Sequence, residues 1–139
     1  MKIVAQLHNS QAKNEVTLQT NDHVHSITIP SKPTGFGSSV NGGELLFLAL
    51  ATCYCNDIYR EATQRGIKVI SVEVTVECEF GGVGEPARNI TYNARVSVEA
   101  SESDILELMK YTDTVAEIQN TLRTGTAITL NRTEAIRVS

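Results

Sequence analysis

The chain has 139 residues and a formal net charge of −4, with 12 lysine and arginine residues against 16 aspartate and glutamate residues. A chain of this length forms one domain and can bury most of its surface without disulfides or a metal. The acidic balance and the lack of any basic cluster argue against a nucleic-acid partner.

The N-terminal segment turns polar at Gln6, and the longest apolar run, residues 45–51, is too short to cross a bilayer. We therefore expect no membrane partner and a cytoplasmic location. The three cysteines are an odd number without framework spacing, which in a reducing compartment favours free thiols over structural disulfides.

The N-terminal part is predicted to be strand-rich and to lead through a loop into a long helix. Residues 1–30 contain short β-favouring segments separated by turn-rich stretches, with strands expected at 2–7, 15–19 and 23–29. Residues 31–43, SKPTGFGSSVNGG, predict a loop because they are rich in Gly, Ser and Pro.

A central helix is predicted over residues 44–65 and ends at Gly66. Nearly every position from Leu45 to Cys55 is apolar, which predicts that the first half of the helix is buried. In so small a domain, a helix that is apolar on all sides indicates that another surface, such as a second subunit, helps to cover it.

The C-terminal part is predicted to contain a long hairpin, two helices and a last strand. Residues 67–99 alternate apolar and polar residues with period two on both sides of a glycine-rich turn, as in an antiparallel pair. Residues 102–123 predict helices that begin at an N-cap, Ser101, and break near 112–114. Residues 125–138 predict a terminal strand, so the fold class is α+β in a single domain over 1–139.

This order of elements resembles the OsmC/Ohr family of osmotically induced and organic-hydroperoxide-resistance proteins. The segment NGGELLFLALATC, residues 41–53, is similar to that family's N-P-E-x-L-L…C motif, and IQNTLRTGTAITL, residues 118–130, is similar to its closing helix and strand. The resemblance implies an intertwined homodimer with antiparallel sheets wrapped around a long buried helix. It also implies two active sites at the subunit interface, where paired thiols reduce a small hydrophobic hydroperoxide.

Cys53 occupies the position of the attacking cysteine in this resemblance. Peroxide reduction needs a thiolate, which becomes a sulfenic acid that a second thiol captures. In the family an N-terminal arginine, held by the motif's glutamate, lies beside the sulfur. Here no arginine precedes Arg60, so Lys13, or one of two histidines, His23 and His25, would have to replace it. The family glutamate aligns with Gly43, which leaves the adjacent Glu44.

The resolving cysteine of the family aligns with Ala116, so the family's intramolecular disulfide cannot form at that position. Cys55 projects roughly 200° away from Cys53 around the helix, which makes it a poor substitute. Cys78 lies on the apolar face of a predicted strand and could approach the helix. For Cys55 and Cys78 we favour the role of small buried hydrophobes.

Two charged residues follow Cys53 on the same helix. Asp57 would raise the pKa of a nearby sulfur, and Arg60 would lower it or pair with Asp57 at the surface. The histidines of HVH and the cysteines of CYC lack metal-ligand spacing, so we expect no metal and no other cofactor.

Two functions remain open from the sequence. The first is a single-cysteine thiol peroxidase in which Cys53 reduces an organic hydroperoxide and an external thiol reductant regenerates it. The second is a non-catalytic domain of the same fold that binds another small apolar ligand at the dimer interface. In either case we expect a pocket lined by Phe36, Phe47 and Tyr54 next to Cys53.

Overall fold

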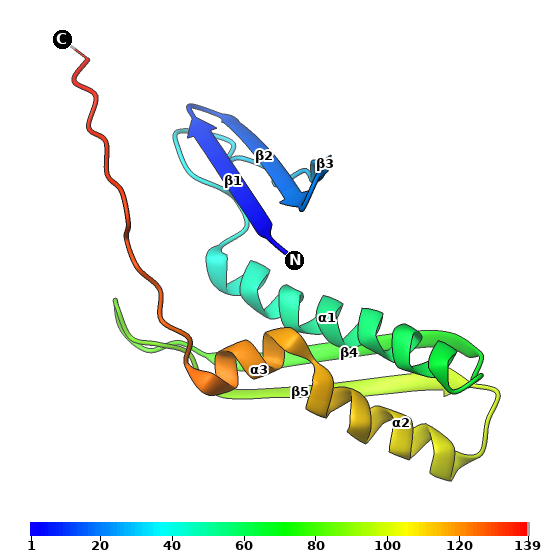
Figure 1. Cartoon of the computed structure of the whole chain (residues 1–139). Coiled ribbons are helices and arrows are strands. Elements are labelled where there is room, and N and C mark those ends of the chain that lie inside the picture. Colours follow the sequence, from blue (N-terminus) through cyan, green and yellow to red (C-terminus); the bar gives the residue numbers. More distant parts are fainter. Residues whose placement is uncertain (139) are drawn as a thin grey trace. The chain divides into compact units, whose positions relative to one another are not determined.

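A computed structural model describes residues 1–138 and has an α+β fold with three helices and five strands in that range (Figure 1). The chain forms two compact units, Met1–Leu48 and the part from Ala49 onwards. The elements in chain order are β1 (Ile3–Ser10), β2 (Lys13–Thr20), β3 (His23–His25), α1 (Gly42–Gln64), β4 (Val69–Glu79), β5 (Arg88–Val98), α2 (Glu102–Val115) and α3 (Glu117–Thr124).

The first unit contains a three-stranded antiparallel sheet in the order β1-β2-β3. β1 pairs with β2 from Ile3↔Thr20 to Ser10↔Lys13, so only two residues form the turn. The second of them, Ala12, has φ 54°, a left-handed backbone conformation that non-glycine residues adopt mainly in turns. The strands therefore run further into the polar stretch 8–14 than the sequence predicts, because ladder pairing outweighs its turn-like composition.

Helix α1 begins at Gly42, two residues before the predicted start, because a capping box fixes its first turn. The Asn41 side chain accepts a hydrogen bond from the Glu44 backbone N–H at 2.8 Å, and the Glu44 side chain accepts one from the Asn41 N–H at 3.0 Å. The helix ends at Gln64, and Gly66 follows with φ 66°, as expected at a helix C-terminus.

The second unit has its core where α1 and α2 pack against the antiparallel pair β4–β5. Tyr54, Ile58 and Ala62 of α1 form a cluster with Leu108 of α2, and partly buried residues of both strands pack against it. Tyr54 also donates a hydrogen bond from its hydroxyl to the Met109 carbonyl at 2.9 Å. The period-two burial of β4 and β5 agrees with the predicted hairpin.

Two features near the C-terminus differ from the sequence prediction. The break between α2 and α3 falls at Ala116, which has extended backbone angles, and not at 112–114. Thr112 is helical and fully buried, and its hydroxyl is satisfied by donating to the Leu108 carbonyl at 2.7 Å. The strand predicted over 125–138 is not formed in this chain, since a strand needs a ladder partner and no described strand pairs with that segment.

The predicted burial of the first half of α1 holds only in part within this chain. Phe47 and Leu50 are buried, but Leu46 and Leu48 are exposed, Leu48 to 61%. Within residues 1–138, no helix combines the length and the hydropathy that a membrane span needs.

Candidate functional site

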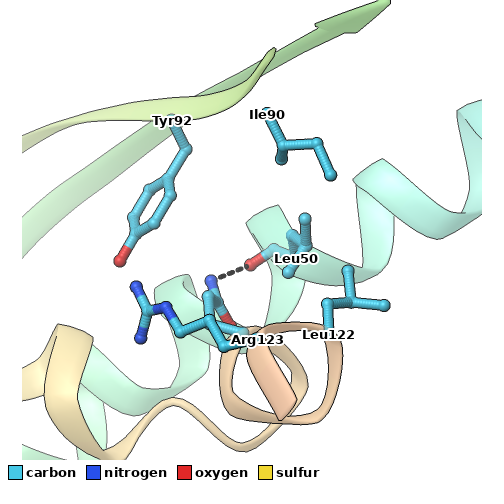
Figure 2. Close-up of a pocket in the computed structure, with 6 residues that line it drawn as sticks. Leu50, Ile90, Tyr92, Leu122 and Arg123 are labelled. Atoms are coloured by element: carbon cyan, nitrogen blue, oxygen red, sulfur yellow. Dashed lines mark hydrogen bonds between the residues drawn. The ribbon is translucent and has the colours of Figure 1, made fainter. Parts of the chain in front are cut away.

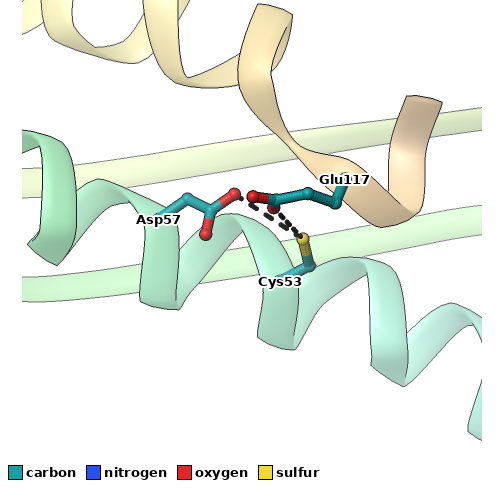
Figure 3. Close-up of side chains that lie close together, drawn as sticks. All are labelled: Cys53, Asp57 and Glu117. Carbon is teal, nitrogen blue, oxygen red and sulfur yellow. Dashed lines mark hydrogen bonds between the residues drawn. The ribbon is translucent and has the colours of Figure 1, made fainter. Parts of the chain in front are cut away.

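Cys53 lies in the middle of α1, opposite the first residue of α3 (Figure 3). Its Sγ is 3.7 Å from the Asp57 Oδ2 atom and 3.8 Å from the Glu117 Oε2 atom. Its single thiol hydrogen can be donated to one of these carboxylates at a time. The sulfur, which is partly buried, therefore lies between two carboxyl groups from separate helices.

Helical spacing and the break at Ala116 together create this arrangement. Asp57 follows Cys53 by four residues and so lies on the same face of α1. Because Ala116 interrupts the helix, α3 starts anew at Glu117 and directs its first turn toward α1. The Gln119 side chain, which donates to the Leu50 carbonyl at 3.0 Å, connects the two helices.

Arg60 supplies the positive charge of the site. Its Nη1 atom lies 2.9 Å from the Asp57 Oδ1 atom and 3.3 Å from the Glu117 Oε1 atom, and its Nε atom lies 2.9 Å from the Glu61 Oε1 atom. The predicted pairing of Arg60 with Asp57 is therefore present. Asp57 is not at the surface, however, because only 5% of it is exposed. The guanidinium neutralises carboxylates that burial would otherwise disfavour.

The surroundings of Cys53 favour the neutral thiol. Burial raises the pKa of the Cys53 thiol, a hydrogen bond from the Ile118 backbone lowers it, and the charges of Asp57 and Glu117 raise it further. The net effect is a raised pKa of Cys53. No arginine or lysine bonds to the sulfur directly, since Arg60 reaches only the carboxylates among the contacts described in residues 1–138.

The pKa values of the two carboxyl groups of the site shift in opposite directions. Burial raises the pKa of Asp57, and a hydrogen bond with Glu117 adds to this, while Arg60 opposes it. A backbone hydrogen bond at its own residue lowers the pKa of Glu117, as do Asp57 and Arg60. Because Glu117 is 63% exposed at its side chain, we place the negative charge on Glu117 and a shared proton nearer Asp57.

The same three side chains are chemically able to bind a divalent cation. One ligand atom each from Cys53, Asp57 and Glu117 lies within 4.8 Å of the others. Arg60 already provides positive charge to both carboxylates, so the arrangement does not call for a metal. His23 and His25 are exposed on β3 in the first unit.

Several predicted site residues belong to the first unit and are described there alone. Lys13 pairs with Glu15 at 3.0 Å across their side chains, Phe36 is exposed, and Phe47 is buried. Glu44 caps α1. A role for these four beside Cys53 remains a prediction.

The other predicted residues lie in the second unit with Cys53. Tyr54 is part of the core, where its ring meets that of Tyr92 edge-on at 5.1 Å between centroids. Cys55 lies beside Val72 and Val74 of β4, and Cys78 is partly buried at the end of the same strand. All three cysteines are free thiols.

Sequence reasoning missed Glu117 and Gln119. Glu117 is 64 residues from Cys53 in the chain, and an acidic residue in the first turn of a helix is ordinary on its own. The sequence holds no local signal that such a residue faces a thiol; only the packing of α3 on α1 reveals it.

Comparisons with known proteins agree with this architecture. The profile of the family described as OsmC-like protein matches residues 35–131. An OsmC-like protein from Mycoplasma pneumoniae is 18% identical with a TM-score of 0.61, and the match covers 86% of this chain and 87% of that one. No curated protein matches the sequence.

Two further solved structures have the same fold. The organic hydroperoxide resistance protein OsmC from Legionella pneumophila is 17% identical with a TM-score of 0.58, over 88% of this chain and 90% of that one. The organic hydroperoxide resistance protein OhrB of Bacillus subtilis is 15% identical with a TM-score of 0.54, over 88% and 91%. The profile match over residues 35–131 shows that the chain belongs to the family of OsmC-like proteins, and these structures have the same fold.

Proposed function

We propose that the protein reduces organic hydroperoxides through Cys53 and uses an external thiol as the reductant. The observation that carries this proposal is the partly buried Cys53 thiol within hydrogen-bonding reach of two carboxyl groups. The carboxyl group of Glu117 is the more exposed of the two and lies 3.8 Å from the sulfur. Two solved structures with this fold are titled organic hydroperoxide resistance proteins.

The reaction begins when Cys53 transfers its proton to a neighbouring carboxylate. The thiolate attacks the terminal oxygen of the hydroperoxide, the O–O bond breaks, and the departing alkoxide takes the proton to become an alcohol. Cys53 is then a sulfenic acid. One external thiol condenses with it to a mixed disulfide and releases water, and a second thiol restores Cys53 as the reductant leaves as a disulfide.

We take the resolving thiol to be external because neither the family's resolving position nor the neighbouring Cys55 is suited to supply an internal one. Position 116 is alanine, and Cys55 projects from another side of α1, where it lies beside β4. The raised pKa of Cys53 makes the thiolate scarce near neutral pH but more nucleophilic once formed. We therefore expect the rate of peroxide reduction to rise with pH above neutrality.

The test measures cumene hydroperoxide consumption with dithiothreitol as the reductant, together with trapping of the sulfenic acid by a dimedone-type reagent. We expect the wild-type chain to be labelled at Cys53 and the Cys53→Ser variant to be inactive. The matched variants Cys55→Ser and Cys78→Ser should keep their activity. An intact wild-type protein that stays unlabelled at Cys53 in excess peroxide would rule the enzyme out.

The alternative is a non-catalytic OsmC-like protein that binds a small apolar ligand. The raised pKa of Cys53 supports this alternative, because two carboxyl groups beside a sulfur oppose thiolate formation. Failure of the labelling experiment, with ligand binding retained, would favour it.

We also propose that the protein is an intertwined homodimer in the cytoplasm. Two features support the dimer: α1 exposes Leu46 and Leu48, and the segment 125–138 has strand-like alternation but pairs with no strand among residues 1–138. Light scattering after gel filtration tests it, with a monomer mass as the contrary result.

A further inference from the structure

The carboxyl groups around Cys53 outnumber the positive charges that pair with them. Three carboxyl groups share the guanidinium of Arg60, those of Asp57, Glu61 and Glu117. Burial raises the pKa of Asp57, so one proton can stay on that group. Glu61 and Glu117 then still exceed Arg60 by one negative charge. Among the ion pairs described in residues 1–138, no other cation reaches these three acids.

Glu117 is the member of this acidic group that solvent reaches. Its side chain is 63% exposed, whereas those of Asp57 and Glu61 are 8% and 10% exposed. One of its carboxylate oxygens lies 3.8 Å from the Cys53 sulfur, and its contact with Arg60, at 3.3 Å, is the longest of the three. A molecule that reacts at the sulfur therefore comes well within the range of this charge, since the screening length in about 0.1 M salt is about 10 Å.

The arginine of α3 does not compensate this negative charge. Arg123 lines a pocket among α1, β5 and α3, where its guanidinium points toward the Tyr92 hydroxyl (Figure 2). It lies 2.6 Å from the Asp113 carboxylate and is therefore already paired. The hydrogen bonds described for the Cys53 side chain in residues 1–138 go to carboxylates. A reagent that approaches the sulfur thus meets a negative field.

We propose that Cys53 selects its thiol reductant by charge, reacting with neutral and cationic thiols in preference to anionic ones, and that Glu117 sets this preference. The inference rests on the proposed function, because it names the class of external reductant that the function requires. An incoming thiolate is already negative at its sulfur. A further carboxylate on its chain is repelled by Glu117, whereas an ammonium group is attracted.

The test follows a thiol–disulfide exchange at Cys53 that uses no peroxide. Methyl methanethiosulfonate converts the Cys53 thiolate to a methyl disulfide and releases methanesulfinate. An added thiolate then attacks the sulfur that carries the methyl group, the S–S bond breaks, and Cys53 leaves as the thiolate while the reagent becomes a methyl disulfide. Intact-protein mass spectrometry gives the rate in a Cys55→Ser/Cys78→Ser double variant, in which Cys53 is the sole thiol.

Three reagents with the same two-carbon chain carry different charges: cysteamine is cationic, 2-mercaptoethanol neutral and 3-mercaptopropionate anionic. Each rate is divided by the rate of the same thiol with the methyl disulfide of N-acetylcysteine amide, which removes intrinsic differences in nucleophilicity. In about 10 mM salt the normalised rate for cysteamine should exceed that for 3-mercaptopropionate by about tenfold, with 2-mercaptoethanol between them. The ratio should shrink toward one in about 1 M salt.

Two matched variants assign the preference to one side chain. Glu117→Gln should lower the ratio of cysteamine to 3-mercaptopropionate by about threefold, and its exposed position makes a folding defect unexpected. Glu107→Gln changes the net charge of the protein equally but lies on α2 beside Arg65, so it should leave the ratio unchanged. Because any change in the pKa of Cys53 affects all three reagents alike, it cancels in the ratio.

Three outcomes would overturn the inference. Equal normalised rates for the three thiols would show that the sulfur senses no net charge. A faster reaction with 3-mercaptopropionate would place a cation beside the sulfur, and an unchanged ratio in Glu117→Gln would assign the preference to another group. Since the assay contains no peroxide, a protein that shows the preference but forms no sulfenic acid would lose the peroxidase function and keep the charge selection at Cys53.

Discussion

Two neighbouring rows of side chains on α1, here called the apolar stripe and the acidic stripe, are almost equally buried although one is apolar and the other is charged. Tyr54, Ile58 and Ala62 are at most 3% exposed, and Asp57 and Glu61, each one position earlier, are 5% and 7% exposed. Both stripes follow the four-residue spacing of a helix face. The apolar stripe meets α2 and the β4–β5 hairpin, whereas the acidic stripe begins at Cys53 and is neutralised by Arg60.

The difference shows which stripe stabilises the fold and which one lies next to the thiol. Burial of Tyr54, Ile58 and Ala62 removes apolar surface from water and stabilises the second unit directly. Burial of carboxylates costs free energy that an ion pair only offsets. An apolar residue at position 57 would be simpler for stability alone, so the buried acid beside Cys53 fits a chemical role.

The largest stability effect is expected in the apolar stripe. Ile58→Ala removes a fully buried side chain from the cluster with Tyr54 and Leu108 and should lower the free energy of unfolding by about 2–5 kcal/mol. Urea unfolding measures the loss. The matched control, Ile128→Ala, alters a side chain that is 98% exposed and should cost less than about 0.5 kcal/mol. Equal losses in the two variants would mean that the apolar stripe is not the core.

The next largest loss of stability is expected in the acidic stripe. Arg60→Met keeps a long side chain but leaves Asp57 and Glu61 buried without their cation, which should cost about 1–2 kcal/mol after allowance for the exposure of Arg60. Arg95→Met is the control, because Arg95 and its partner Glu73 are both exposed, and it should cost less than about 0.5 kcal/mol. A double variant with Asp57→Asn should recover part of the loss; strict additivity would contradict the pairing.

The sequence predicts the elements that build the apolar stripe better than it predicts the contacts around Cys53. The order of elements and the Ser101 cap, which accepts a hydrogen bond from the Asp104 N–H at 3.2 Å, are local patterns, and the structure has them. The placement of Glu117 beside Cys53 depends on a helix break one residue earlier and on packing across 64 residues, so no local pattern encodes it. The segment 125–138 shows the converse, because its alternation is a strand pattern but strand formation depends on a partner.

A smaller effect follows from the protonation of the acidic stripe. Burial and Glu117 raise the pKa of Asp57, so the native state favours its protonated form. The contribution of Asp57 to stability is therefore full below the unfolded-state value of 3.8 and is lost as pH rises through the raised pKa. Relative to Asp57→Asn, wild-type stability should decline as the pH rises above the unfolded-state value of 3.8.

Denaturant unfolding at several pH values measures that difference. Asp22→Asn changes an exposed aspartate of the first unit and should follow the wild-type curve throughout. A wild-type protein that gains stability over Asp57→Asn as pH rises would reverse the sign and place the ionised form of Asp57 in the native state.

The smallest effect tests whether Glu117, the carboxyl group of α3 beside Cys53, opposes ionisation of the thiol. Glu117→Gln removes the negative charge of Glu117 beside Cys53 and should lower the pKa of the Cys53 thiol, because that charge contributes to the upward shift. At pH 7 the rate of Cys53 alkylation by iodoacetamide, followed by peptide mass spectrometry, should rise, but by less than about fivefold because Glu117 is largely exposed. Glu107→Gln on α2, whose partner is Arg65, should leave the rate unchanged. A slower reaction in Glu117→Gln would mean that this carboxylate promotes ionisation by taking the thiol proton more than it opposes ionisation through its charge.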